Sequence, residues 1–397
     1  MLAKRIQEEA KAIFKQVQAD RRHLHQHPEL SFEEVQTAQY IAKQLTASGI
    51  SFEQGVAGYG IVALIKGKDP ERKTIALRAD MDALPIQEEN VVSYASHVPG
   101  KMHACGHDVH TASLLGAARI LQTLRSEFSG TIKLLFQPGE EKLPGGASIM
   151  IKEGALTKPS PRSIFGQHVH PPLAAGKVGF RPGKYMASAD EIYVSVHGKG
   201  GHGAIPNETI DPILLAAHLI TALQQIISRN ANPLIPSVLT FGKINSTGGA
   251  TNIIPEEVKI QGTFRTMNEA WRKEAHQRMK KMAEELVSAM GGHCDFEVVV
   301  GYPTLYNDEV LTNNARKWAE AYLGAENVVD LPMRLSAEDF AYYSQEIPAC
   351  FYRLGTGNIE RGITSSVHTP TFDIDESALE IGAGLMAWLA VCSLAEE

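Results

Sequence analysis

The sequence is poor in several features that would direct it to a particular class of protein. It contains only four cysteines among 397 residues, Cys105, Cys294, Cys350 and Cys392, and their spacing is irregular. Nothing therefore indicates a disulfide framework. Basic residues are not in excess either, with 38 Lys and Arg against 45 Asp and Glu and a formal net charge of −7. Proteins that bind a nucleic-acid backbone usually present a basic field, so we expect no nucleic-acid partner.

Long apolar runs are also scarce. We find no run that approaches the roughly 18 apolar residues needed to span a membrane, so we expect no membrane partner. Residues 1–22 mix charges with apolar residues at spacings of three and four. This pattern predicts an amphipathic helix and not a signal peptide. A reducing cytoplasm is the expected location, where Cys105 is free to be a thiolate ligand or a nucleophile.

The length of the chain favours two domains, because a single hydrophobic core stops growing beyond about 250–300 residues. Four apolar runs bounded by turn residues predict buried strands at 60–65, 74–80, 131–141 and 163–171. Helical patterns alternate with these runs. This alternation predicts a doubly wound α/β sheet, in which ligands bind beyond the carboxyl ends of the strands.

Two of the intervening helices have clear patterns. Ser31 and Glu34 form a capping-box pattern, which predicts a helix over 33–48. Leu114, Leu121 and their apolar neighbours at helical spacing predict another helix between the second and third strands.

From about Met186 the pattern changes to alternating strands and long helices in the order βαββαβ. This order is the signature of a ferredoxin-like module. We therefore predict a catalytic domain made of residues 1–186 and 302–397, with residues 187–301 inserted as a separate ferredoxin-like α+β domain. The C-terminal segments, including an apolar helix over 377–394, should complete the first sheet.

Three of the predicted strands end in unusual polar clusters. Asp80 and Asp82 follow one strand, the pair Glu140 and Glu141 follows the next, and a third strand carries His168 and His170. Because the carboxyl ends of parallel strands meet at one edge of a sheet, these side chains should converge there.

The chemistry of this edge indicates a metal site. Cys105 and His107 lie two residues apart in a turn that contains glycine, and His368 lies near the C-terminus. Sulfur, nitrogen and oxygen ligands in this mixture suit zinc, and equally manganese, cobalt or nickel at an open site. Two ions could be held if one ligand bridged them.

The adjacent glutamates predict hydrolysis. One carboxylate can hold the metal while its neighbour takes the proton of a water whose pKa the metal lowers from about 15.7 towards 7. Taken singly, these residues have ordinary alternatives: a solvated Glu pair, a buried apolar Cys105, and surface or capping roles for His103 and His110. His168 and His170 alternate along one strand, so one could face the cleft while the other is a hydrogen-bonded strand histidine.

Read in order, these segments resemble the amidohydrolase branch of the aminoacylase and carboxypeptidase superfamily of metallopeptidases. That branch contains N-acyl-L-amino-acid amidohydrolases, hippurate hydrolases and auxin-conjugate hydrolases. The matching segments run from about residue 21 to 376 and are RRHLHQHPEL, LRADMDALPI, MHACGHDVHTASLLGAA, FQPGEE, QHVHP, GKGGHGAIP, TNIIPE, GTFRT, EDFAYY and HTPTFDIDE.

The resemblance implies roles for individual residues of the edge. The implied metal ligands are Cys105, His107, Glu141, His168 and His368, with the Cys105 thiolate bridging two ions. Glu140 is the implied general base, which then protonates the leaving amine, and Asp82 is the implied carboxylate that orients a ligand. Asp80 stands where sister branches have a metal-binding histidine, and the resemblance gives it no ligand role.

In this family the inserted domain is a lid and usually the dimerisation surface, which implies a homodimer. His202 is similar to the histidine that stabilises the tetrahedral oxyanion, as Asn252 could also do. Arg265 resembles an arginine that binds the free carboxylate of an N-acyl amino acid. The alternative for Arg265 is an exposed cation at the end of a strand.

We therefore expect a cytoplasmic, metal-dependent amidohydrolase that cleaves the acyl amide of N-acyl L-amino acids. Alternatives are a dipeptidase or carboxypeptidase of the same superfamily, a thiol hydrolase that uses Cys105 with His107 and Asp108, and a non-catalytic metal-binding or ligand-sensing protein. The thiol mechanism is disfavoured because adjacent loop residues seldom reach the geometry of nucleophile and base. A binding protein would not need the general base beside Glu141.

Overall fold

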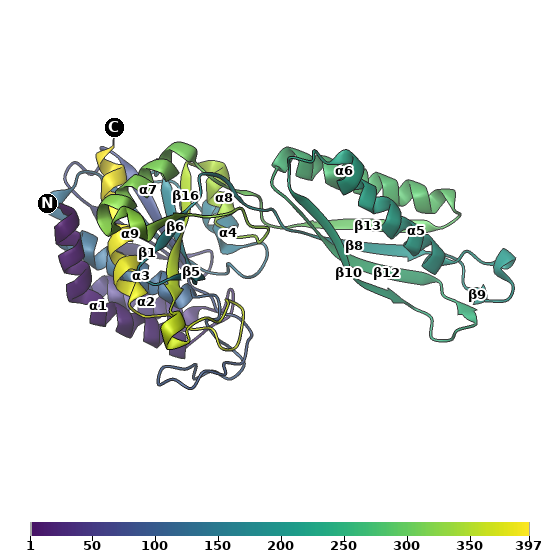
Figure 1. Ribbon diagram of the computed structural model, residues 1–397, viewed down its shortest axis with the longest axis horizontal. Coiled ribbons are helices and arrows are strands. Elements are labelled where there is room, and N and C mark those ends of the chain that lie inside the picture. The colour runs from purple at the N-terminus through teal and green to yellow at the C-terminus, as the bar shows by residue number, and fades with distance from the viewer. Residues whose placement is uncertain (1, 397) are drawn as a thin grey trace. The chain divides into compact units, whose positions relative to one another are not determined.

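The computed structural model describes residues 2–396, which fold into two compact units (Figure 1). The large unit contains the chain up to Lys184, the segment Tyr306–Met333 and the chain from Asp339 onward. The small unit contains Tyr185–Leu305 together with Arg334–Glu338. Each unit has its own hydrophobic core.

An eight-stranded mixed sheet forms the centre of the large unit. Its strands, in spatial order, are β1 (Ser51–Val56), β2 (Gly60–Lys66), β4 (Thr131–Gln137), β3 (Thr74–Asp80), β5 (Ile164–Ala174), β16 (Ala349–Gly357), β6 (Val178–Phe180) and β15 (Val328–Asp330). The four central strands are parallel, whereas β1 and β2 are antiparallel additions. All four predicted strands are present, and the third ends at Gln137, which leaves Glu140 and Glu141 in the loop beyond it.

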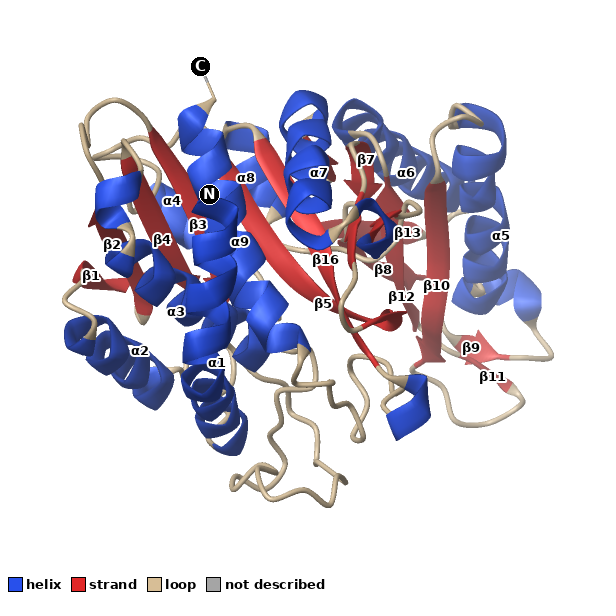
Figure 2. Cartoon of the chain, turned by 60° about the vertical axis from the view of Figure 1, so that its left-hand side comes forward, coloured by secondary structure: helices blue, strands red, loops and turns tan. Residues whose placement is uncertain are grey.

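Helices pack on both faces of this sheet, so the predicted doubly wound α/β class is confirmed (Figure 2). One face is covered by α1 (Leu2–Gln26), α3 (His107–Thr123), α7 (Glu309–Leu323) and α9 (Ala378–Ala395). The other face carries the short helices α4 (Gly146–Lys152) and α8 (Ala341–Glu346). The predicted N-terminal amphipathic helix is confirmed by α1, whose buried stripe includes Ile6, Ala10 and Val17.

Helix α9 corrects the expectation that no apolar run approaches membrane-spanning length. It has 18 residues and is long and apolar enough to cross a membrane by these two criteria alone. Most of the helix is buried within the large unit, where it packs against α1 and α3. Its apolar character on all sides is that of a central core helix.

The predicted capping box is wrong. Helix α2 spans Val35–Ala47, and Glu34 at its N-cap position makes no side-chain capping hydrogen bond. The Ser31 hydroxyl instead donates to Asp82 Oδ2 at 2.6 Å, and Glu34 Oε1 accepts the Gly139 N–H at 2.8 Å. Tertiary partners near the metal-site residues have replaced the local capping contacts.

The small unit contains a four-stranded antiparallel sheet in the order β10-β12-β8-β13. The elements along the chain are β8 (Asp190–His197), α5 (Pro212–Gln225), β10 (Ser237–Ser246), β12 (Glu257–Thr266), α6 (Glu269–Ala289) and β13 (His293–Val300). This order confirms the inserted ferredoxin-like module. Two short strands, β9 (Gly201–His202) and β11 (Ile253–Ile254), pair beside it, while β7 (Gly183–Met186) and β14 (Leu305–Asn307) lie where the chain passes between the units.

Candidate metal and catalytic site

The parallel strands bring the predicted polar clusters of the large unit to the same level of the sheet. Asp80 at the end of β3 is in register with Gln137 at the end of β4. The register between β3 and β5 pairs Arg78 with Gly166, so His168 lies two residues further along, level with Asp80. Strand geometry, and not sequence proximity, therefore assembles the site.

A glycine turn presents Cys105 and His107. Gly106 has a left-handed backbone, with φ of 85°, and it precedes the first turn of α3. A Cβ atom at this position would lie 2.6 Å from a methyl carbon of Val169. Glycine is therefore required both by the backbone conformation and by the close approach of β5. The turn leaves Cys105 and His107 buried on the same side as His168.

The five predicted ligands converge. Cys105 Sγ lies 3.5 Å from His168 Nε2 and 3.3 Å from His368 Nε2. Glu141 Oε1 lies 3.2 Å from His368 Nε2 and 3.9 Å from His107 Nε2. Ligand atoms of His107, Glu140 and Glu141 also lie within 4.8 Å of one another.

The donor atoms are left open in a way that fits a metal ion. His107 Nε2 and Glu141 Oε1 are buried and make no hydrogen bond within the described part of the chain, and the nearest group to Glu141 Oε1 is another predicted ligand, His368, at 3.2 Å. His168 Nδ1 donates to the carbonyl of Val169 at 2.8 Å, which leaves the lone pair of its Nε2 directed at Cys105. Orphaned buried polar atoms are costly unless a further group satisfies them, and a divalent cation would do so here.

The structure distinguishes His168 from His170, but not by strand alternation. Residues two apart lie on the same side of a strand, so alternation cannot distinguish these histidines. Burial does distinguish them, since His168 is 7% exposed and His170 is only partly buried. The structure brings His168 to Cys105.

Asp82 is placed to orient a ligand. Its Oδ1 accepts a hydrogen bond from His107 Nδ1 at 3.0 Å, and its Oδ2 accepts from Ser31 and from the Glu141 backbone N–H. Burial acts to raise the pKa of Asp82, but these donors outweigh burial and lower the pKa below its usual value. The ionised carboxylate therefore fixes the His107 ring with Nε2 free for metal.

Asp80 and His110 are hydrogen-bonded to each other and to further groups of the large unit. His110 Nδ1 donates to Asp80 Oδ1 at 2.5 Å, while His110 Nε2 accepts the Val169 N–H at 2.9 Å. The other oxygen of Asp80 accepts from Arg78 at 2.5 Å. With these atoms occupied, Asp80 and His110 belong to a supporting network and not to the open donor set.

Sequence reasoning missed the rest of this network. Arg78 also donates to Asp339 Oδ1 at 2.6 Å, and Gln137 donates to Asp339 Oδ2 at 2.7 Å. The backbone N–H of Asp339 in turn lies 3.3 Å from Glu140 Oε1, so this buried network reaches the predicted general base. A basic residue inside the otherwise apolar strand 74–80 was the available signal, because a buried arginine requires carboxylate partners.

Asp108 belongs to a second buried network that was also missed. Its Oδ2 accepts from Arg21 Nε at 2.9 Å and from His25 Nδ1 at 2.7 Å. Burial acts to raise the pKa of Asp108, but Arg21 and His25 hold this pKa far below its ordinary value. Asp108 is thus committed to helix α1, which removes the acid from the thiol-hydrolase alternative. Buried His103 lies nearby, and burial lowers its pKa to about 4.

The remaining predicted residues belong to the small unit. His202 on β9 is exposed, and its Nδ1 accepts the Ala204 N–H at 3.0 Å. The carbonyl of Asn252 accepts the Gly203 N–H at 2.8 Å, so Asn252 lies beside His202. Arg265 on β12 donates to the Leu335 carbonyl at 3.1 Å. Their roles toward a substrate stay predictions.

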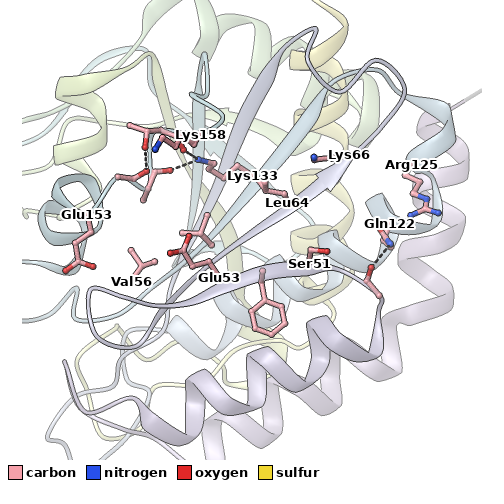
Figure 3. Close-up of a pocket in the computed structure, with 16 residues that line it drawn as sticks. Ser51, Glu53, Val56, Leu64, Lys66, Gln122, Arg125, Lys133, Glu153 and Lys158 are labelled. Carbon is pink, nitrogen blue, oxygen red and sulfur yellow. Dashed lines mark hydrogen bonds between the residues drawn. The ribbon is translucent and has the colours of Figure 1, made fainter.

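A separate hollow of about 700 Å³ lies on β1, β2 and β4 (Figure 3). Its buried Lys133 is only 1% exposed and donates to the carbonyls of Ala155 and Thr157 at 2.9 and 2.6 Å. The lysine thereby holds the 153–158 turn against the sheet. None of the predicted ligands or catalytic residues lines this hollow.

The family described as Peptidase family M20/M25/M40 matches residues 76–391. The chain belongs to this family. An N-acetyl-L-cysteine deacetylase of Bacillus subtilis is 43% identical over 366 residues, which cover 92% of this chain and 85% of that protein. A protein of Saccharolobus solfataricus named thermostable carboxypeptidase 1 is 38% identical over 374 residues, covering 94% of this chain and 93% of that protein.

A solved structure agrees with the fold and the site chemistry. A Bacillus subtilis protein described as a dinuclear metal binding peptidase of this family matches with a TM-score of 0.83 and 36% identity, covering 97% of this chain and 99% of that chain. Family membership together with the clustered donor atoms makes this M20 protein a metal-dependent hydrolase that acts on amide bonds.

Proposed function

We propose that this M20 protein hydrolyses the acyl amide bond of N-acyl L-amino acids at a centre that holds two divalent ions. The observation that carries the proposal is the convergence of Cys105, His107, Glu141, His168 and His368, with the carboxylate of Glu140 beside them. Five donors of mixed sulfur, nitrogen and oxygen type exceed what a single closed tetrahedral site needs.

The position of Cys105 supports a bridging role. Its sulfur lies within 3.5 Å of one histidine and 3.3 Å of another, so it can serve a site on the His168 side and a site on the His368 side. Zinc, manganese, cobalt and nickel all suit this donor set. When bound, such ions supply Lewis acidity, which polarises the amide carbonyl and acidifies water.

Glu140 carries the proton transfers. Its carboxylate, which the Asp339 N–H contacts at 3.3 Å, accepts a proton from the attacking water. The water oxygen bonds to the carbonyl carbon, the C–N bond breaks, and Glu140 returns the proton to the amine nitrogen. The products are a carboxylate and a free amino acid.

The proposal also assigns substrate-binding and assembly roles to the small unit. His202 and Asn252 donate to the developing oxyanion, and Arg265 binds the carboxylate of the amino acid. The unit acts as the lid and as the contact surface of a homodimer. We place the enzyme in the cytoplasm.

A carboxypeptidase activity is the second candidate, because the relative from Saccharolobus solfataricus bears that name. A carboxypeptidase or dipeptidase must accept substrates with a free amino group or a longer peptide. The amidohydrolase proposed here must instead prefer a simple acyl group on the nitrogen.

One screen separates these candidates. Protein stripped of metal with a chelator and reloaded with zinc, manganese, cobalt or nickel is assayed against acetyl, benzoyl and indoleacetyl amino acids and against dipeptides. We expect hydrolysis of the acyl amino acids, only after reloading. Preference for dipeptides would favour the second candidate, activity in the presence of chelator would favour a thiol mechanism, and metal content without any hydrolysis would favour a binding protein.

A further inference from the structure

Glu140, the proposed general base, has a hydrogen-bond partner in the backbone of Asp339. Glu140 lies in the loop beyond β4 and is 7% exposed. Its Oε1 accepts the backbone N–H of Asp339 at 3.3 Å. Hydrogen bonds of catalytic groups are often long before a substrate binds. The contact defines the position of one carboxylate oxygen of Glu140.

The side chain of Asp339 is completely buried and is held by donors from three elements of the large unit. Its Oδ1 accepts from Arg78 of β3 at 2.6 Å and from Gln137 of β4 at 2.9 Å. Its Oδ2 accepts from Gln137 at 2.7 Å and from the backbone N–H of Ala147, in α4, at 3.0 Å. A carboxylate offers about four acceptor positions, so these four bonds hold the side chain in one orientation.

The position of Asp339 along the chain shows why the anchoring of its side chain matters. The segment Arg334–Glu338 belongs to the small unit, and Asp339 is the first residue of the large unit after it. Segments that connect two units are ordinarily flexible. The N–H that contacts Glu140 belongs to the peptide bond at this crossing, so without an anchor it would share that flexibility. The bonds from β3, β4 and α4 to the Asp339 carboxylate fix this point of the chain within the large unit.

Arg78 supplies the charge that allows a second buried carboxylate beside the base. A carboxylate oxygen of Asp339 lies within 4.8 Å of one of Glu140, and like charges at this distance repel each other. The guanidinium of Arg78 is completely buried and lies 2.6 Å from Asp339 and 2.5 Å from Asp80. Asp339 is therefore a paired carboxylate. A neutral residue in place of Asp339 still leaves Arg78 its partner Asp80, so such a variant does not strand a buried cation.

We propose that Asp339 is a positioning residue that acts through Glu140. Its anchored side chain sets the place of its backbone N–H, and this N–H holds the Glu140 carboxylate where it takes the proton of the attacking water. The inference rests on the function proposed above, in which Glu140 is the general base, and it gives Asp339 no contact with substrate or metal. A base must lie within about 2.6–3.2 Å of the group whose proton it removes, and a displacement of about 1 Å can cost a factor of about 10² in rate.

A double-mutant cycle on the full, metal-loaded chain tests this role. All four hydrogen bonds to the Asp339 carboxylate come from donors, so the amide of Asp339→Asn places its NH₂ group against a donor whichever way it is turned. Wild type, Asp339→Asn, Glu140→Gln and the double variant are assayed on an N-acyl amino acid that the wild type hydrolyses, with bound metal counted in each sample. We expect Asp339→Asn to lower kcat about 10–100-fold with KM and metal content unchanged. In the Glu140→Gln background the same substitution should lower kcat by less than about twofold, because the group through which Asp339 acts is already lost.

Asp20→Asn is the matched control, because Asp20 is also a buried carboxylate paired with an arginine, Arg119, but lies on α1. It should keep the wild-type kcat. Thermal unfolding checks that each variant folds. If Asp339→Asn does not fold, the cycle is run by the same criteria with Gln137→Met, which removes the side chain that donates to both oxygens of Asp339.

Two results overturn the inference and leave the proposed function intact. One is a wild-type kcat in Asp339→Asn, and the other is an equal fold-loss in the wild-type and Glu140→Gln backgrounds, which a merely structural role would give. A wild type that hydrolyses no acyl amino acid would instead overturn the proposed function and this inference with it, so the two failures are distinguished.

Discussion

His107 shows how the contacts of one residue decide what it can bind. Its Nδ1 is held by Asp82 at 3.0 Å, and its Nε2 is buried without a hydrogen-bond partner among the described residues. The hydrogen bond to Asp82 fixes the orientation of the ring, so Nε2 is the nitrogen that can bind an ion. The ligand is therefore organised before any ion arrives.

We expect Asp82→Asn to weaken metal binding by about 10–100-fold, as is typical when a carboxylate behind a histidine ligand is lost. The amide nitrogen cannot accept the hydrogen bonds that Ser31 and the Glu141 N–H now donate to Oδ2. Competition with a chromophoric chelator measures the affinity. Asp330→Asn, at an exposed carboxylate of β15, should bind metal as the wild type does. An unchanged affinity in Asp82→Asn would contradict this role.

Among the elements, the start of α3 connects backbone geometry to ligand position. Gly106 separates Cys105 from His107 and adopts a conformation that side chains rarely tolerate. A Cβ atom at the same residue would lie 2.6 Å from a methyl carbon of Val169, so the turn at the start of the helix packs closely on the strand that carries His168.

Gly106→Ala should lower both stability and metal affinity. A left-handed backbone costs a residue with a side chain about 1–2 kcal/mol, and overpacking typically adds about 1–3 kcal/mol. Gly100→Ala is the matched control, because Gly100 also has a positive φ, of 74°, but has open space at its Cβ position. Urea unfolding and metal titration of both variants separate strain from contact. Equal behaviour of the two variants would show that the contact with Val169 is unimportant.

Glu34, the residue that precedes α2, makes the free energy of unfolding depend on pH. Burial, followed by the charge of Asp82, raises the pKa of Glu34 to about 7 from its ordinary 4.5. Between these values the folded state keeps the Glu34 proton while the unfolded state loses it. This contribution to the free energy of unfolding is thus fully present below the ordinary pKa and is lost as the pH rises through the folded pKa.

Glu34→Gln should remove this dependence, because the amide imitates the protonated acid and still accepts the Gly139 N–H. Relative to this variant, the wild type should lose about 2 kcal/mol between about pH 5.5 and about pH 7.5. Denaturant unfolding of metal-loaded protein measures the difference. Glu33→Gln, at the exposed neighbouring position, should follow the wild type. A constant difference between wild type and Glu34→Gln across this range would refute the raised pKa.

At the scale of the whole molecule, the features that could be predicted from the sequence are those that follow from the local spacing of apolar residues or from general rules of sheet topology. Apolar runs predicted the strands, and the convergence of Asp80, Glu140 and His168 followed from parallel strands that end at one edge. The resemblance singled out Cys105 and His368, which lie 263 residues apart and touch in the structure.

The parts that the sequence did not predict depend on partners distant along the chain. Ser31 and Glu34 match the capping-box pattern in the sequence. In the structure, however, the Ser31 hydroxyl donates to Asp82 and the Glu34 carboxylate accepts the Gly139 N–H, so neither side chain caps the helix. Asp108 stands next to a ligand, yet its partners are on α1, 83 and 87 residues earlier. No local pattern distinguishes such a residue from a catalytic acid.

Substitutions of the adjacent glutamates test the central claim most directly, because the two variants are expected to lose different properties. Glu140→Gln should bind metal as the wild type does and lose turnover by about 10²–10⁴-fold, the usual contribution of a general base. Glu141→Gln should lose metal affinity first. The decisive measurement is the kcat of metal-loaded Glu140→Gln on an N-acyl amino acid that the wild type hydrolyses, with bound metal counted in the same sample. A full metal content with kcat reduced at least about a hundredfold supports the account, whereas a full metal content with kcat near the wild-type value would contradict it.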